Sequence, residues 1–128
     1  MRTTGKHVLI IDDDEGTLES FARMLRLSGY TVSLALDVTT AWRKIVATPP
    51  DAILLDLRMP ILDGLAFLRR LRATDSRRHT PVAVITGDYF IEEKMMDELR
   101  ELDAVVCFKP LWIQEILKIV QNLLRTAH

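Results

Sequence analysis

The chain has 128 residues, 48% of them hydrophobic, and its 17 basic and 18 acidic side chains leave a formal net charge of -1. This size and composition suit a single globular domain over residues 1–128, with its core over about 6–125, and the near-neutral charge gives no indication of nucleic acid or an anionic membrane as a direct partner. No apolar run approaches the length of a bilayer span and no secretory signal opens the chain, so we expect a cytoplasmic protein without membrane partners.

Five short runs rich in Val and Ile alternate with stretches of helical periodicity. In chain order, the apolar runs span residues 8–11, 31–35, 52–55, 82–85 and 104–108. Apolar residues spaced three or four apart follow each of them, at 18–25, 42–46, 65–71, 91–102 and 113–124. Such runs are typical of strands buried on both faces, and the alternation predicts a five-stranded parallel sheet in a doubly wound (βα)5 three-layer sandwich.

Charged side chains follow three of these runs directly. Asp12, Asp13 and Asp14 follow the first run, Asp56 follows the third and Lys109 follows the fifth. Because the carboxyl ends of parallel strands meet at one edge of the sheet, we expect these groups to converge on one charged pocket.

Carboxylates from two strands at one edge would repel each other unless a cation lay between them. Mg2+ prefers oxygen ligands and keeps several waters, so one or two carboxylates and a carbonyl are enough to hold it. We expect Asp13 and Asp56 to bind Mg2+ directly, and the backbone carbonyl of Arg58 to complete the protein ligands. Asp12 would support the ion through a water or through those ligands, and the open positions on the metal would suit phosphate oxygens.

Lys109 and Thr86 supply the other half of an anion site. A lysine ammonium is a compact charge for phosphate, and Pro110 restricts the backbone that presents it. Thr86 ends the fourth strand with Gly87 behind it, so its hydroxyl is placed to donate to a phosphoryl oxygen. Together these groups predict a phosphoryl-transfer pocket in which a carboxylate receives the group.

The whole chain resembles the response-regulator receiver domains of two-component signalling. The likeness rests on motifs in the family's order and approximate spacing: Ile11-Asp12-Asp13-Asp14, Asp56-Leu57-Arg58-Met59-Pro60 with Asp63-Gly64, Thr86, and Lys109-Pro110. It implies the flavodoxin-like fold of CheY-like proteins. It also implies a phosphoacceptor signalling domain rather than an enzyme, with only self-catalysed phosphoryl transfer and slow autodephosphorylation of its own.

The resemblance also implies a role for each site residue. Asp56 would accept a phosphoryl group from a phosphohistidine on a sensor histidine kinase or a histidine phosphotransfer protein, with Mg2+ held by Asp13, Asp56 and the Arg58 carbonyl. Lys109 would pair with the phosphoryl group, and Thr86 would move towards it. The phosphorylated domain would bind a downstream effector domain or protein through the surface of the fourth helix, fifth strand and fifth helix. A phosphorylation-dependent homodimer is a further possibility at this point.

One position departs from the family pattern. Many members carry an aromatic residue three positions before the lysine, where this chain has Val106. Phe108 lies one residue before Lys109 and, by strand alternation, should point to the same face as Val106. In those members the aromatic ring rotates inward when the threonine moves. Here either Phe108 takes over part of that rotation or the rotation is absent.

Several of these residues also have purely structural interpretations. Acidic residues after a strand often cap the next helix, which applies to Asp12, Asp13 and Asp14. For Asp63-Gly64 a turn and helix cap is the favoured interpretation. The basic residues at 69–72 and 77–79 favour a solvated face, and Trp42 and Trp112 favour packing.

Two rival functions stay open at this point. One is a small Mg2+-dependent phosphatase or phosphotransferase with an aspartate nucleophile, against which stands the lack of a cap domain or long loop to enclose a substrate. The other is an interaction module that keeps the fold without being phosphorylated. The acidic residues, Asp56, Thr86 and Lys109 argue against that module, whereas Val106 argues faintly for it.

Overall fold

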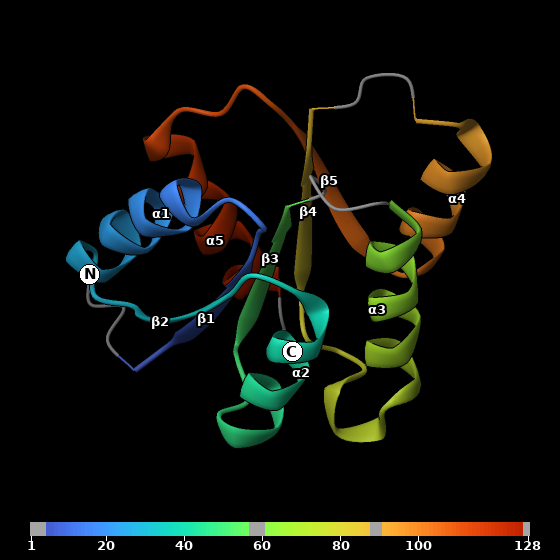
Figure 1. The fold of residues 1–128 in the computed structure, drawn as a ribbon, viewed down its shortest axis with the longest axis horizontal. Helices are drawn as coiled ribbons and strands as arrows, with labels where there is room; N and C mark the ends of the chain where they lie inside the picture. The colour runs from blue at the N-terminus through green and yellow to red at the C-terminus, as the bar shows by residue number, and fades with distance from the viewer. Residues whose placement is uncertain (1–4, 57–60, 88–90, 127–128) are drawn as a thin grey trace.

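The computed structural model describes residues 5–56, 61–87 and 91–126, and within them five parallel strands form one sheet in the order β2-β1-β3-β4-β5. The strands are β1 (His7–Ile11), β2 (Thr31–Ala35), β3 (Ala52–Asp56), β4 (Val82–Thr86) and β5 (Ala104–Phe108). The helices between and after them are α1 (Glu15–Leu27), α2 (Val38–Ala47), α3 (Ile61–Ala73), α4 (Glu93–Glu101) and α5 (Ile113–Thr126) (Figure 1). The predicted doubly wound parallel sheet is confirmed.

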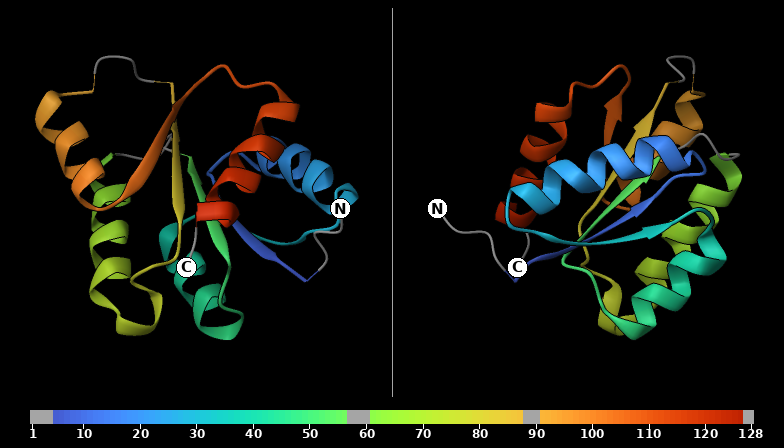
Figure 2. Two further views of the ribbon diagram at one scale, coloured as in Figure 1. Left: turned by 180° about the vertical axis from the view of Figure 1, so that it is seen from behind. Right: turned by 60° about the vertical axis from the view of Figure 1, so that its left-hand side comes forward.

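Helices cover both faces of the sheet. α1 and α5 pack on one face, over Val8 and Ile10 of β1, whereas α2, α3 and α4 pack on the other, over Leu9 and Ile11 (Figure 2). Alternate residues of one strand therefore enter two separate hydrophobic layers. Because β3 is buried along its whole length, both of its faces need apolar side chains, which explains its near-continuous Ile and Leu run.

The prediction that all five strands are buried on both faces is wrong for the two edge strands. Residues of β2 are mostly half-buried, and in β5 Val105 is 50% exposed. Each edge strand has a neighbour on one side only, so the helices that cover the centre of the sheet leave part of it open.

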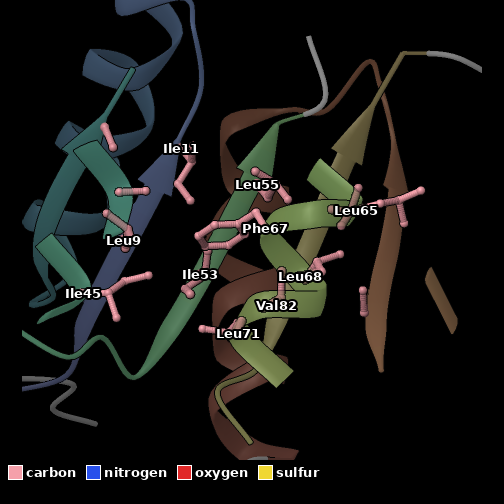
Figure 3. Close-up of a cluster of buried hydrophobic side chains, with 14 of the residues drawn as sticks. Leu9, Ile11, Ile45, Ile53, Leu55, Leu65, Phe67, Leu68, Leu71 and Val82 are labelled. Atoms are coloured by element: carbon pink, nitrogen blue, oxygen red, sulfur yellow. The ribbon is translucent and has the colours of Figure 1, made fainter. Parts of the chain in front are cut away.

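The layer beneath α2, α3 and α4 is the larger of the two cores. Figure 3 shows Phe67 and Leu68 of α3 lying over Ile53 and Leu55 of β3. Trp42 of α2 packs against Phe67 with ring centroids 5.6 Å apart, so its predicted packing role is confirmed. α3 thereby packs on β3, the strand that ends at Asp56.

Two local predictions are wrong, and a third is wrong at one residue. Asp63 and Gly64 lie within the first turn of α3 rather than in a turn before it, where an acidic side chain complements the helix dipole. Trp112 is 77% exposed and does not pack in the core. The basic residues at 69–72 and 77–79 are mostly exposed, as predicted, but the Arg72 guanidinium is half-buried and donates to backbone carbonyls, including that of Leu102 at 2.7 Å.

No helix of the described residues is both long enough and apolar enough to cross a bilayer.

Candidate functional site

Four polar side chains line the edge of the sheet where the strands end. Asp12 follows β1, Asp56 and Thr86 are the last residues of β3 and β4, and Lys109 follows β5. These four strands are neighbours in one parallel sheet, so their carboxyl ends lie along one edge, which faces upwards in Figure 1. Asp12, Asp56 and Thr86 are the buried polar side chains of the described part of the chain. The predicted convergence therefore occurs for these four residues.

Asp56 forms an ion pair with Lys109 across the end of β4. The Lys109 Nζ donates to Asp56 Oδ1 at 2.9 Å and lies 2.7 Å from Oδ2, so it faces both carboxylate oxygens. The Asp56 side chain is only 2% exposed, whereas that of Lys109 is 24% exposed. The backbone N–H of Lys109 donates to the Thr86 carbonyl at 2.8 Å, and this bond joins the start of the segment between β5 and α5 to the end of β4. A buried carboxylate is thus held beside a cation that reaches solvent.

Asp12 lies against the Asp56 carboxylate. The pKa of Asp12 is raised to about 7, first because burial disfavours its charged form and next because it shares a hydrogen bond with Asp56. The N–H of Asp14, which donates to Asp12 Oδ1 at 3.0 Å, and the charge of Lys109 act in the opposite direction. Two carboxylates and one ammonium leave this pocket short of positive charge when both acids are ionised.

The donor set at this edge fits Mg2+. It consists of carboxylate oxygens, which are the ligands that this hard cation prefers, and a cation between Asp12 and Asp56 would relieve their repulsion. In the described ranges, no three acidic, histidine or cysteine side chains converge as a metal site, and Asp13 is exposed at the rim. The predicted backbone ligand, the carbonyl of Arg58, lies outside the described residues. Mg2+ would accordingly keep several waters here.

Asp14 caps helix α1. Its Oδ1 accepts the backbone N–H of Gly16 at 3.2 Å, and its Oδ2 accepts the Thr17 hydroxyl at 2.6 Å. The capping interpretation therefore holds for the third acidic residue of the run, while the first is a buried member of the site. The run of three acids therefore has two roles: Asp14 caps α1, and Asp12 is part of the buried site.

The Asp14→Ala substitution separates these two purposes. We expect it to lower the free energy of unfolding by about 1 kcal/mol, because it leaves N-terminal N–H groups of α1 without their cap. Phosphoryl uptake should survive, because the Asp14 carboxylate bonds to Gly16 and Thr17 of α1. Chemical denaturation checks the first effect, and complete loss of uptake in the folded variant would contradict the second.

A hollow of about 740 Å3 opens beside Lys109. It lies between the first turns of α1 and the segment that joins β5 to α5, and its lining comprises Asp14, Gly16, Thr17, Ser20, Phe21, Ile85, Gly87, Lys109, Pro110, Leu111 and Ile113. Most of these residues carry no motif, so the sequence offered no signal for them. The hollow gives a partner molecule an approach to the lysine end of the site.

A family model supplies the decisive comparison. The model described as the response regulator receiver domain matches residues 8–121. The chain belongs to this family. It is a receiver domain of two-component response regulators, and such domains are signalling domains rather than true enzymes.

The curated relatives that this receiver domain matches are regulatory proteins. It is 39% identical to the transcriptional regulatory protein PrrA of Mycobacterium leprae, over 92% of this chain and 49% of that protein. It is 37% identical to the response regulator MprA of Mycobacterium ulcerans, over 92% of this chain and 50% of that protein. The chain spans about half the length of the curated relatives it matches.

Solved receiver structures share its fold. The chemotaxis response regulator CheY4 of Vibrio cholerae superposes with a TM-score of 0.81 at 26% identity, covering 94% of this chain and 99% of that one. The receiver domain of the Francisella response regulator 1452 gives a TM-score of 0.78 at 26% identity, covering 94% and 98%. The two-component signalling context inferred from the motifs is thereby confirmed.

This receiver domain departs from the family pattern beside Thr86. Val106 packs into the layer beneath α2, α3 and α4, so no aromatic ring occupies that position. Phe108 pairs in register with Thr86 and is 37% exposed. Because paired residues of neighbouring strands share a face, Phe108 lies on the same side of the sheet as Thr86.

Proposed function

We propose that Asp56 is the phosphoacceptor of this receiver domain and that it takes its phosphoryl group from a phosphohistidine of a sensor histidine kinase or a histidine phosphotransfer protein. The observation that carries the proposal is the buried Asp56 carboxylate beside Asp12 and the Lys109 ammonium. In the transfer, a carboxylate oxygen of Asp56 forms a bond to phosphorus while the P–N bond breaks, and the electron pair of that bond stays on the imidazole. Hydrolysis of the resulting acyl phosphate regenerates the carboxylate and releases phosphate.

The neighbours of Asp56 have separate tasks in this reaction. Lys109 now pairs with the carboxylate and is placed to pair with the oxygens of an incoming phosphoryl group, because its ammonium is partly open to solvent. Thr86 ends the adjacent strand, so its hydroxyl is the group we assign to a phosphoryl oxygen once Asp56 is modified. Charge stabilisation of this kind is the main means by which proteins promote phosphoryl transfer.

Mg2+ completes the site in this proposal. We assign it to Asp12, Asp13 and Asp56, with Asp13 and Asp56 as direct ligands, the Arg58 carbonyl as the backbone ligand and Asp12 as support. When bound, Mg2+ neutralises the charge that develops on the phosphoryl oxygens. The close Asp12 and Asp56 carboxylates support this assignment, since they leave room for one more positive charge.

The hollow beside Lys109 supports a protein as the phosphodonor. Asp56 is buried and its strand end faces the sheet edge, so a donor imidazole must approach over that edge. The apolar residues of the hollow, among them Phe21 and Leu111, offer the contact area for such a partner. No part of the chain encloses a small substrate at this edge within the described residues, and the neighbouring hollow is open.

We further propose that phosphorylation changes the binding of a downstream effector through the surface of α4, β5 and α5. Exposed apolar side chains on β5, such as Val105, give this surface a starting contact. The name of the relative PrrA, a transcriptional regulatory protein, supports a transcriptional output of the complete regulator. A phosphorylation-dependent homodimer through the same surface belongs to this proposal.

Acetyl phosphate tests the proposed chemistry without a kinase. We expect the intact mass of the protein to rise by one phosphoryl group when acetyl phosphate and Mg2+ are both present, and to stay unchanged when a chelator removes the metal. Peptide mapping should place the label on the peptide that contains Asp56. A label that forms equally well without Mg2+, or that lies on another residue, would contradict the proposal.

A further inference from the structure

The free edge of the sheet at β2 carries two backbone carbonyls that point away from β1. On the β1 side of the strand, the Thr31 N–H donates a bond of 3.0 Å and the Ala35 carbonyl accepts one of 3.0 Å. Alternate residues starting from Thr31 therefore direct their backbone groups towards β1, and the residues between them direct theirs to the opposite side. Val32 and Leu34 thus present their carbonyls at the edge where β2 has no neighbouring strand.

A cationic side chain bonds to each of these carbonyls. Arg26, in the last turn of α1, donates from Nη2 to the Val32 carbonyl at 3.2 Å. Lys44, in the last turn of α2, donates from Nζ to the Leu34 carbonyl at 2.5 Å. Because α1 and α2 pack on opposite faces of the sheet, the two side chains reach the edge from both sides; the right-hand view of Figure 2 shows β2 running between these helices. Both outward carbonyls of β2 are therefore already bonded.

The attachment of β2 to the sheet has other sources. All five residues of the strand pair with β1 in parallel register. The His7 ring of β1 adds a side-chain link, since its two nitrogens lie 2.8 Å from the hydroxyl oxygens of Thr31 and Ser33. With the ladder and this ring in place, the register of β2 is fixed without Arg26 or Lys44.

The surroundings of this edge favour association with another chain. An edge strand with unpaired backbone groups is a template for a further strand. The elements that meet here also carry exposed apolar side chains: Leu27 at the end of α1 is 80% exposed, Leu36 after β2 is 47% exposed and Val46 of α2 is 71% exposed. A two-fold axis through Ser33 would place β2 of a second copy antiparallel to this strand, so that the edge is complementary to itself. A second copy of this chain is therefore the partner that fits an open edge.

We infer that Arg26 and Lys44 close the free edge of β2 to pairing with a second copy of this chain. Each cation occupies a carbonyl to which an N–H of an added strand would donate, so that strand would have to displace it. In the two-fold arrangement the cations of both copies would also meet at the same edge and repel each other.

This closure does not depend on the proposed phosphoryl transfer. It makes the two edges of the sheet unequal, because the other edge strand, β5, lies in the surface to which we assign effector binding. Contacts between copies through a sheet edge would accordingly be directed to the β5 side.

Removal of both cations tests the inference. We expect Arg26→Ala/Lys44→Ala to self-associate with a dissociation constant roughly ten- to a hundredfold lower than that of the unmodified protein, because an added strand no longer has to displace two bonds. Sedimentation velocity over a concentration series, without phosphodonor, measures the association. Amide hydrogen exchange should slow with rising concentration at Val32 and Leu34, whose outward N–H groups would gain partners in the added strand.

Two further double variants are the matched controls. Arg23→Ala/Arg43→Ala removes the same charge from exposed positions of the same two helices, and Arg26→Lys/Lys44→Arg keeps a cationic donor at both guarded positions. Both should sediment as the unmodified protein does. Equal association of Arg23→Ala/Arg43→Ala would assign the effect to lost charge alone and overturn the inference.

Three other outcomes would also overturn it. The first is an Arg26→Ala/Lys44→Ala protein that loses stability to urea but sediments as the unmodified protein, which would show that the cations only support the fold. The second is association without slower exchange at Val32 and Leu34, which would place the contact on another surface. The third is an unmodified protein that already protects these two amides as its concentration rises.

Discussion

We expect Asp56→Asn to abolish phosphoryl uptake from acetyl phosphate entirely. The amide lacks the anionic oxygen that would attack phosphorus, and the other buried acid, Asp12, is kept partly protonated by its raised pKa. Asparagine has nearly the shape of aspartate, so the site should stay packed. Intact mass after incubation with acetyl phosphate and Mg2+ measures the effect.

Asp63→Asn is the matched control for this loss. Asp63 is an exposed acid in the first turn of α3, close in the chain to Asp56, and it lines a separate hollow between α2 and α3. Its variant should incorporate phosphate as the unmodified protein does. Circular dichroism should show Asp56→Asn folded, because Lys109 can turn its charge towards solvent once its partner is neutral. Undiminished labelling of folded Asp56→Asn would exclude Asp56 as the acceptor.

We expect Asp12→Asn to stabilise the Mg2+-free protein and to weaken its binding of Mg2+. The pKa of Asp12 is raised to about 7 in the fold, above its ordinary value near 4, so the folded state keeps a proton that the unfolded chain loses. Stability from this group is therefore full below about pH 4 and falls as the pH rises to about 7, with a penalty on the order of 2–4 kcal/mol above that. The amide carries no charge and avoids the penalty.

Urea unfolding of both proteins across this pH range, without divalent ions, measures the difference. The variant should be the more stable protein at about pH 8, and its advantage should shrink towards about pH 4, where Asp12 is protonated in both states. Added Mg2+ should stabilise the unmodified protein more than the variant, because binding to the folded state alone raises stability. An advantage that does not vary with pH would contradict the cause assigned to the shift.

Because position 106 is a valine and not an aromatic residue, an inward rotation of a ring at this position cannot transmit phosphorylation to the proposed output surface. Val106 is part of the core and cannot swing as a ring does. The residue paired in register with Thr86 is Phe108, and α4 is the next helix along the chain after β4.

Much of the fold could be read from local pattern. The runs that contain Ile53 and Val84 are apolar on both faces, and only a strand covered by helices on both sides needs that pattern. The placement of Asp56 and Lys109 at strand ends then predicted their meeting, since parallel strands bring their carboxyl ends to one edge. These features were accessible because they follow from short-range periodicity and one topological rule.

Contacts between helices were not accessible in the same way. The pairing of Arg69 with Glu98 depends on how α3 and α4 pack, and the half-burial of Arg72 depends on two chain turns that meet beside it. A basic run on a helix is solvated in most proteins, so the pattern favoured solvation for Arg72 as well as for its exposed neighbours. Trp112 was misjudged for the opposite reason, because only the packing of α5 leaves its ring exposed.

Residue type and spacing along the chain were enough to predict the succession of strands and helices, the parallel sheet, the family and the group of residues that carry the proposed chemistry. The three-dimensional packing was needed to show which acid of the run is buried against Asp56, how far the edge strands are exposed and which side chains of α3 bond to α4. Those outcomes depend on contacts between segments distant in the chain, whose distances and burial no local pattern contains.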